Sequence, residues 1–214
     1  MVETVAAAPA PPAPLEAVAP PQTPTPEELY EALDEETRAE LIDGEIIIMS
    51  PATLLHSRTS DRLLRLMSFF VEVRGLGEVF GNAGMHLGEQ RYVPDVAFVA
   101  SSHSERVQGT HIAGAADLVV EVLSPSTAGR DWGSKMRDYE QYGVPEYWLL
   151  NPVVEQINVY VLDAAGKYQP LAPDAAGRYH SQVLPGFFVE RGWLWPATGE
   201  AADALAALRA LALL

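Results

Sequence analysis

Residues 117–126, DLVVEVLSPS, form the stretch that decides the fold of this chain. The run is apolar from Leu118 to Leu123 except for one acid, is rich in β-branched residues and is closed by a Ser-Pro pair. This pattern is typical of a strand that is buried on both faces of a sheet. The acid, Glu121, lies in the middle of the run, where an unpaired carboxylate is costly to desolvate. We therefore expect Glu121 to be protonated, paired with a cation or bound to a metal.

A second acid opens another apolar strand upstream. A Pro-Asp pair ending at Asp95 precedes the run VAFV at residues 96–99. Two strands that each carry one acid in an otherwise apolar run predict a single acidic site at the edge of a sheet. The residues alone also leave structural roles open, because Asp95 can cap a turn and Glu121 can pair with Arg130 or Lys135.

The neighbouring segments predict one α/β domain with a mixed sheet. Asp43-Gly44 lies between two β-rich runs and indicates a hairpin over residues 40–49. The passage from the Glu121 strand through a helix to a strand at 146–150 predicts a parallel crossover. The other elements expected are a helix over 54–74, short strands near 78–80 and 84–87, a polar loop over 101–115, a hairpin over 156–171, a strand after residue 187 and a closing helix over 199–212.

Composition limits the class of protein. The chain has 214 residues, 48% of them hydrophobic and 20% charged, as expected for a globular domain, and no apolar run approaches the roughly 20 residues of a membrane-spanning helix. It contains no cysteine, which excludes disulfides and thiolate sites and agrees with the cytoplasmic location that we expect. The net charge of −15 disfavours broad attraction to nucleic acid, but residues 1–50 supply −10 of it through eleven acids and one base, Arg38.

The first 26 residues differ from the rest of the chain. They are dominated by Ala and Pro and have few large apolar side chains, so we expect a disordered tail over residues 1–26 and a single folded domain over residues 27–214. Thr25 can cap the first helix and Pro26 suits its first position.

Several motifs together resemble a known family. They are the Pro-Asp pair ending at Asp95, the run VVEVLSPS at 119–126, Lys135 on the next helix and GVPEYWL at 143–149. The sequence resembles the Uma-type family of restriction-endonuclease-like proteins, within the PD-(D/E)XK nuclease superfamily, over roughly residues 27–195. The resemblance implies a restriction-endonuclease-like α/β core, in which a mixed central sheet is flanked by helices and carries extra β-hairpins.

The resemblance also implies the roles of three residues. Asp95 and Glu121 would hold Mg²⁺ or Mn²⁺, and Lys135 would be the catalytic lysine. In the standard motif the lysine follows the acid by two residues, where this chain has Leu123, so the resemblance is to members whose lysine has moved to the following helix. Lys135 is the only lysine between Glu121 and Lys167. From its own surroundings, Lys135 also fits an ordinary solvated helix position.

Other residues are weaker candidates for the same site. His56 could be an accessory ligand or phosphate contact, or simply an exposed residue at a helix start, and an acid of the hairpin could join the metal ligands. A row of arginines could contact phosphates or form a solvated face. These candidates are His56, Glu40 and Glu45 as accessory residues, and Arg58, Arg62, Arg65 and Arg130 as phosphate contacts.

Three functional hypotheses follow. The first is a metal-dependent DNA endonuclease, acting as a homodimer, in which metal-activated water attacks the phosphodiester. The second is a catalytically silent nuclease-fold protein that acts through protein–protein interaction. The third, an enzyme acting on a small phosphorylated substrate, ranks last because the sequence has no Gly-rich phosphate loop. The position of Lys135 distinguishes the first two, because a catalytic lysine must lie in the cleft with the acids.

Overall fold

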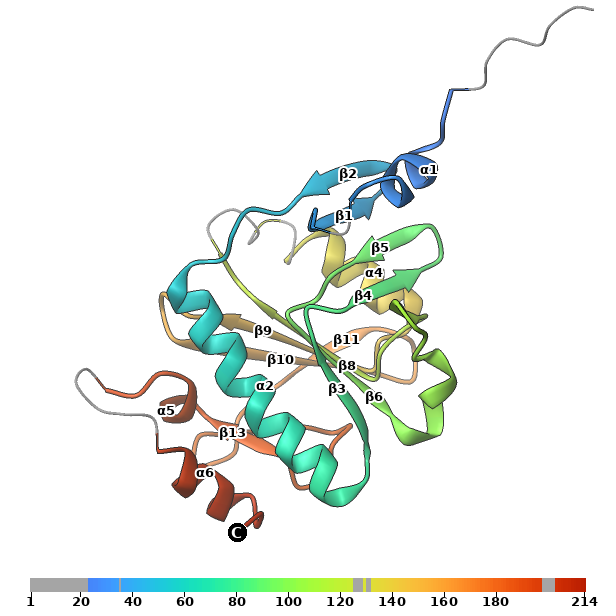
Figure 1. Ribbon diagram of the computed structural model, residues 1–214. Helices are drawn as coiled ribbons and strands as arrows, with labels where there is room; N and C mark the ends of the chain where they lie inside the picture. The colour runs from blue at the N-terminus through green and yellow to red at the C-terminus, as the bar shows by residue number, and fades with distance from the viewer. Residues whose placement is uncertain (1–22, 35, 125–128, 130–131, 198–202) are drawn as a thin grey trace, which may run out of the picture.

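The computed structural model describes residues 23–34, 36–124, 129, 132–197 and 203–214. Two main sheets and the helices packed against them form the fold (Figure 1). Arg130 and residues 1–22 of the expected tail lie outside the described residues. Of the helices that the structure describes, none combines the length and the apolar character that a membrane crossing requires.

The larger sheet has six strands in the order β11-β10-β9-β8-β6-β3. Strands β8 and β9 run parallel and every other neighbouring pair is antiparallel, so the predicted mixed sheet and parallel crossover are confirmed. The strands are β3 (Gly77–Gly81), β6 (Val96–Ala100), β8 (Leu118–Val122), β9 (Glu146–Asn151), β10 (Gln156–Leu162) and β11 (Tyr168–Leu171).

The smaller sheet has five strands in the order β2-β1-β5-β4-β7. The predicted hairpin joins β1 to β2, and its two turn residues, Asp43 and Gly44, both have positive φ angles (52° and 79°), as a two-residue hairpin turn requires. The strands are β1 (Ala39–Ile42), β2 (Glu45–Ile48), β4 (Gly84–Leu87), β5 (Gln90–Tyr92) and β7 (His111–Ala113), and a separate ribbon pairs β12 (Arg178–His180) with β13 (Phe188–Glu190).

The helix ends follow the capping residues. The Thr25 side chain accepts the Glu28 amide and the Glu28 carboxylate accepts the Thr25 amide, so the predicted start of the first helix is confirmed. Gly75 and Gly143 end two helices with left-handed backbone angles. The helices are α1 (Pro26–Glu31), α2 (Leu54–Arg74), η1 (Ser101–Arg106), α4 (Ser134–Tyr142), α5 (Arg191–Leu194) and α6 (Ala204–Ala210).

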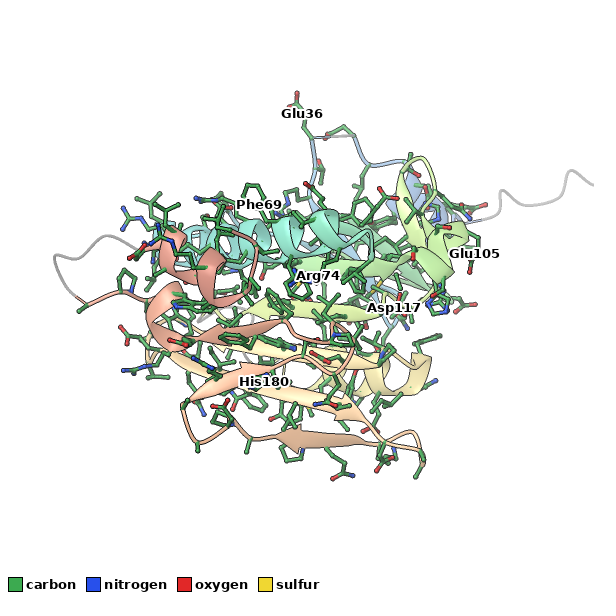
Figure 2. The ribbon with its side chains drawn as sticks, turned by 90° about the horizontal axis from the view of Figure 1, so that it is seen from below. Glu36, Phe69, Arg74, Glu105, Asp117 and His180 are labelled. Carbon is green, nitrogen blue, oxygen red and sulfur yellow. The ribbon has the colours of Figure 1, made fainter. Side chains whose placement is uncertain are left out.

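Strand β8 is buried on both faces, as its composition predicts. Val120 packs in one apolar cluster with Phe70 of α2, and Val119 packs in a second cluster with Tyr139 of α4 and residues of the smaller sheet. Figure 2 shows α2 lying along one face of the larger sheet. Because successive strand residues point to opposite faces, Glu121 projects toward α4 and the smaller sheet.

The GVPEYWL motif has a structural function in β9. Tyr147 and Trp148 are fully buried. The Trp148 indole donates to one oxygen of Glu146 at 2.6 Å, and the other oxygen accepts the amides of Gln182 and Val183 at 2.7 and 2.9 Å. Burial raises the pKa of the Glu146 carboxyl, while these hydrogen bonds oppose the rise. Through these hydrogen bonds, Glu146 links residues 182 and 183, which precede β13, to β9 of the larger sheet.

One region differs from the sequence prediction. The segment 101–115 is not a continuous loop, because it contains η1 and strand β7. The carboxylate of Asp117 accepts the Ala100 amide at 2.7 Å and lies 2.8 Å from His103 Nδ1, which anchors η1 beside the larger sheet (Figure 2).

His86 of β4 should make stability depend on pH. Its ring stacks on His111 with centroids 3.6 Å apart, and burial, Arg91 and His111 lower its pKa from 6.5 to about 4. Between these values the unfolded chain binds more protons, so stability falls as the pH falls from about 6.5 toward 4. Urea unfolding at about pH 7 and pH 5 should show a loss of about 1 kcal/mol, after allowance for solvent screening, that His86→Gln reduces. Equal losses in both proteins would contradict this assignment.

Candidate active site

Strand pairing brings Asp95 beside Glu121. Strands β6 and β8 are antiparallel with Val96 opposite Val120, so Asp95 and Glu121 occupy the next facing positions. The Asp95 carboxylate accepts the Val122 amide at 2.7 Å. Both acids are largely buried, with 8% and 4% of their surfaces exposed. The structure thus joins the two acids that the sequence singled out.

Lys135 reaches the same place from α4. Its ammonium nitrogen lies 2.9 Å from Glu121 Oε1 and 2.8 Å from Glu40 Oε1, and the residue is only 2% exposed. Tyr139, one turn later on α4, donates its hydroxyl to the same Glu121 oxygen at 2.8 Å. Burial and the Glu121 charge raise the pKa of Tyr139, which keeps its hydroxyl protonated as a donor. Lys135 and Tyr139 together hold the Glu121 carboxylate against α4.

The two acids of the hairpin are placed differently. Glu40 of β1 is buried, contacts Lys135 and accepts the Val93 amide at 3.1 Å. Glu45 opens β2 opposite Ile42, is exposed and has no place in this cluster. Of the two tentative accessory acids, the structure brings only Glu40 to the site.

His56 contacts the metal-ligand candidate Asp95. It lies in the first turn of α2, after the capping residue Thr53, and its Nε2 is 3.2 Å from Asp95 Oδ2. The histidine is partly buried rather than an exposed helix-start residue. Its role as an accessory residue stays a prediction.

These side chains line one cavity of about 430 Å³. Asp95, Glu121, Lys135 and His56 share the cavity with polar residues from three other segments. Two of them, Arg38 and Asn82, were not predicted from the sequence as residues of this site, and neither was the hydrogen bond from Tyr139. The position of Tyr139 four residues after Lys135 was a usable signal, because such residues lie on the same face of a helix.

A comparison with models of protein families shows which family this chain belongs to. Residues 26–191 match the model of the Uma2 family, which is described as "Putative restriction endonuclease". The chain belongs to the Uma2 family. This confirms the resemblance inferred from the VVEVLSPS and GVPEYWL motifs.

A solved structure shares the fold of this Uma2 chain. It is a crystal structure described as that of "a putative nuclease belonging to DUF820 from Anabaena variabilis ATCC 29413". The similarity has a TM-score of 0.67 with 20% sequence identity and covers 80% of this chain and 97% of the other. The predicted nuclease-like α/β architecture is thereby confirmed. No curated protein matches the sequence.

The donor set of the Uma2 site fits a hard divalent cation. Asp95 and Glu121 lie at facing positions of the paired chain segments and both line the cavity, so each can offer carboxylate oxygens. Within the described ranges, no group of three or more His, Asp or Glu residues is arranged to hold a metal ion. Magnesium commonly uses one or two carboxylates and completes its shell with water and substrate phosphate. The pair therefore matches an open magnesium-type site better than a closed structural one.

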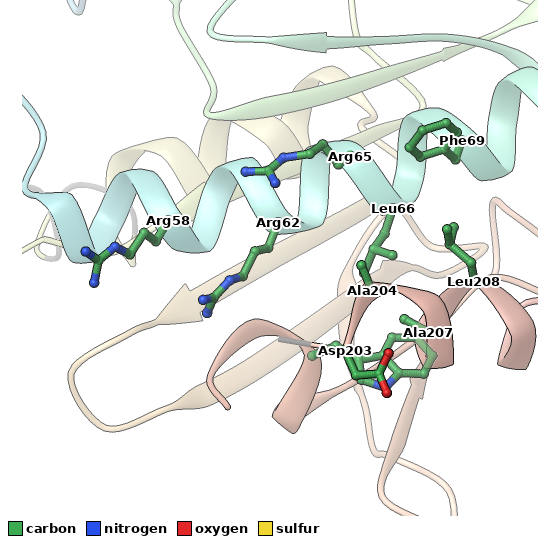
Figure 3. Close-up of a pocket in the computed structure, with 10 residues that line it drawn as sticks. Arg58, Arg62, Arg65, Leu66, Phe69, Asp203, Ala204, Ala207 and Leu208 are labelled. Carbon is green, nitrogen blue, oxygen red and sulfur yellow. The ribbon is translucent and has the colours of Figure 1, made fainter. Parts of the chain in front are cut away.

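The arginine row of α2 lies elsewhere. Arg58, Arg62 and Arg65 line a different cavity of about 360 Å³, between α2 and α6, where they project from successive turns of α2 (Figure 3). Arg62 donates to the carbonyl of Leu194 at 2.5 Å, and Arg65 lies 3.9 Å from Asp61. These three arginines do not line the cavity that contains Asp95 and Glu121, and phosphate contact by them stays a prediction.

Proposed function

We propose that this Uma2-family protein is a metal-dependent endonuclease that hydrolyses phosphodiester bonds in DNA. The observation that carries the proposal is the convergence of Asp95, Glu121 and Lys135 in one cavity, from the residue before β6, from β8 and from α4. Acid pairs beside a lysine are suited to phosphoryl chemistry, because the acids attract a hard cation and the lysine offers positive charge to the phosphate.

Each residue has a distinct task in this proposal. Asp95 and Glu121 would hold Mg²⁺ or Mn²⁺, which supplies charge to polarise a phosphoryl oxygen and to lower the pKa of water. Lys135 stabilises the negative charge that develops on the transferred phosphoryl group. Glu40 positions Lys135 through the 2.8 Å contact, and Tyr139 positions Glu121 through its hydroxyl. His56 orients the Asp95 carboxylate from the start of α2.

The burial of Lys135 supports catalysis over the alternative, a silent nuclease-fold protein that acts through protein–protein interaction. A lysine kept for surface solubility extends into water, whereas Lys135 contacts two buried carboxylates beside the cavity. Burying three charged groups costs desolvation free energy, and such buried charged groups are often found at functional sites. Homodimeric assembly on duplex DNA and a cytoplasmic location are further parts of the proposal, and light scattering with and without DNA tests the assembly.

Plasmid nicking tests the proposal directly. Supercoiled plasmid should be converted to open-circular and linear forms in Mg²⁺ or Mn²⁺, and excess EDTA should stop the conversion because the carboxylates alone cannot polarise the phosphate. Agarose gels with time points measure the rate, and protein from the same purification carrying Asp95→Asn controls for contaminating nucleases. Equal nicking by the wild type and Asp95→Asn, or nicking unaffected by EDTA, would contradict the proposal.

A further inference from the structure

An exposed arginine lines the cavity that holds the acidic site. Arg38 precedes β1 and shares the cavity with Asp95, Glu121 and Lys135. It is the only basic residue among the first 50, which contain eleven acids. Arg38 is thus the single basic side chain of an acidic segment, and it lies at the cavity of the candidate active site.

Arg38 is held in place at both its backbone and its side chain. Its carbonyl accepts the Met49 amide at 2.9 Å, and its Nη2 donates to the Asn82 side-chain oxygen at 2.6 Å. Asn82 lies between β3 and β4 with a left-handed φ of 53°, and its own amide donates to the Asp95 carbonyl at 3.2 Å. The guanidinium is therefore oriented by Asn82, whose backbone amide is hydrogen-bonded to Asp95.

Asn82 orients the guanidinium of Arg38 but does not offset its positive charge. The ion pairs among the described residues include Arg91 with Glu27 and Arg178 with Glu190, but none that involves Arg38. Its hydrogen-bond acceptor is a neutral amide. A guanidinium that is oriented in this way is suited to bind an anion with its remaining N–H groups.

The lining of the cavity indicates which anion would fit. Hydroxyl groups of Ser50 and Ser57 line the cavity together with Arg38 and can donate hydrogen bonds to an oxyanion. The carboxylates of Asp95 and Glu121 in the same cavity would repel a free acid unless a cation lay between them. A phosphodiester strand meets both conditions, because one phosphate can lie at the acids with a cation while its neighbour meets the arginine.

We infer that Arg38, oriented by Asn82, binds a backbone phosphate of the DNA strand next to the phosphate that is hydrolysed. The inference rests on the proposed function, from which it takes DNA as the ligand. It assigns a substrate-binding role to two residues that lie outside the set of Asp95, Glu121 and Lys135.

A structural role for the same pair predicts different results for one substitution. Asn82→Asp keeps the size and the turn preference of the residue and strengthens its contact with Arg38, but it also neutralises the guanidinium. If the pair only joined β1 to the turn after β3, Asn82→Asp would weaken DNA binding no more in the wild type than in the Arg38→Ala background, where only the repulsion by the added carboxylate acts. If Arg38 binds phosphate, the same substitution should weaken DNA binding more in the wild type than in the Arg38→Ala background, while thermal stability is maintained.

The experiment compares the wild type with Arg38→Ala, with Asn82→Asp and with the variant that carries both substitutions. Binding of a fluorescein-labelled DNA duplex is measured by anisotropy over a series of KCl concentrations, with Ca²⁺ replacing Mg²⁺ and gels confirming that the DNA stays intact. Arg209→Ala, which removes an exposed arginine in the last turn of α6, is the matched control. We expect affinity about tenfold weaker and a salt slope lower by about one in both single variants, and wild-type behaviour in the control.

Wild-type affinity and salt slope in Arg38→Ala would overturn the inference. Weaker binding in Arg38→Ala would also overturn it if Asn82→Asp weakened binding no more in the wild type than in the Arg38→Ala background, because the effect would then not depend on the arginine charge. Plasmid nicking by the same wild-type sample reports separately on the proposed function. Nicking that persists while Arg38→Ala binds normally rejects the phosphate role alone, and a wild type that neither nicks nor binds DNA rejects both.

Discussion

Replacing Glu121 by glutamine is expected to reduce plasmid nicking at least about a hundredfold while the fold is kept. Glutamine has nearly the same shape, and its carbonyl oxygen can still accept hydrogen bonds from Lys135 and Tyr139, which contact Glu121 at 2.9 and 2.8 Å. The substitution removes the negative charge, which the proposed cation site needs. Nicking rates in Mg²⁺ and in Mn²⁺ measure the effect, and circular dichroism checks the fold.

Glu45→Gln is the matched control for this prediction. It makes the same chemical change at an exposed acid of the β1–β2 hairpin, outside the cavity. We expect wild-type nicking from Glu45→Gln. Comparable activity in Glu121→Gln and the wild type would show that the carboxylate charge at position 121 is not required for cleavage.

Replacing Lys135 by methionine is expected to lower the free energy of unfolding by about 3 kcal/mol and to abolish nicking. Methionine keeps much of the side-chain volume but leaves the buried carboxylates of Glu40 and Glu121 without the ammonium that contacts both. Removing one partner of a buried ion pair lowers stability more than replacing the whole pair, because the other partner is then a buried charge without a counter-ion. Urea unfolding at neutral pH, followed by tryptophan fluorescence, measures the loss.

A second substitution separates stability from catalysis at Lys135. Glu40→Gln in the Lys135→Met background removes one of the two buried carboxylate charges that the substitution leaves without a counter-ion, so it should recover part of the lost stability. Nicking should stay absent, because the charge that acts on the phosphate is still missing. Recovery of both stability and nicking in the double variant would show that Lys135 has only a structural role.

The central strand and the acid pair could be predicted because the information is local. The apolar run from Leu118 to Val122 requires only that both faces of β8 are covered, as they are by the clusters of Val119 and Val120. Two acids at equivalent positions of neighbouring strands then meet once the strands pair. The hairpin at Asp43-Gly44 was predictable for the same reason, since the turn residues and the flanking strands are contiguous.

The surroundings of the site depend on contacts between distant segments. Helical periodicity placed Arg58, Arg62 and Arg65 on one face of α2, but no local pattern shows that α6, more than 130 residues later, covers that face. Arg38 entered the cavity unpredicted because its place depends on the Asn82 contact across 44 positions. Strand β7 was missed because it pairs in parallel with β4 and has only three residues.

Isothermal titration calorimetry with Mn²⁺ shows directly whether Asp95 and Glu121 form a cation site. We predict one binding event in the wild type and in Glu45→Gln, and its loss in Asp95→Asn and Glu121→Gln, because the two facing carboxylates form the cation site together. All four proteins should have the same circular dichroism spectrum. If both Asp95→Asn and Glu121→Gln bind Mn²⁺ as the wild type does, or if the wild type binds no Mn²⁺, then these two carboxylates do not form a cation site.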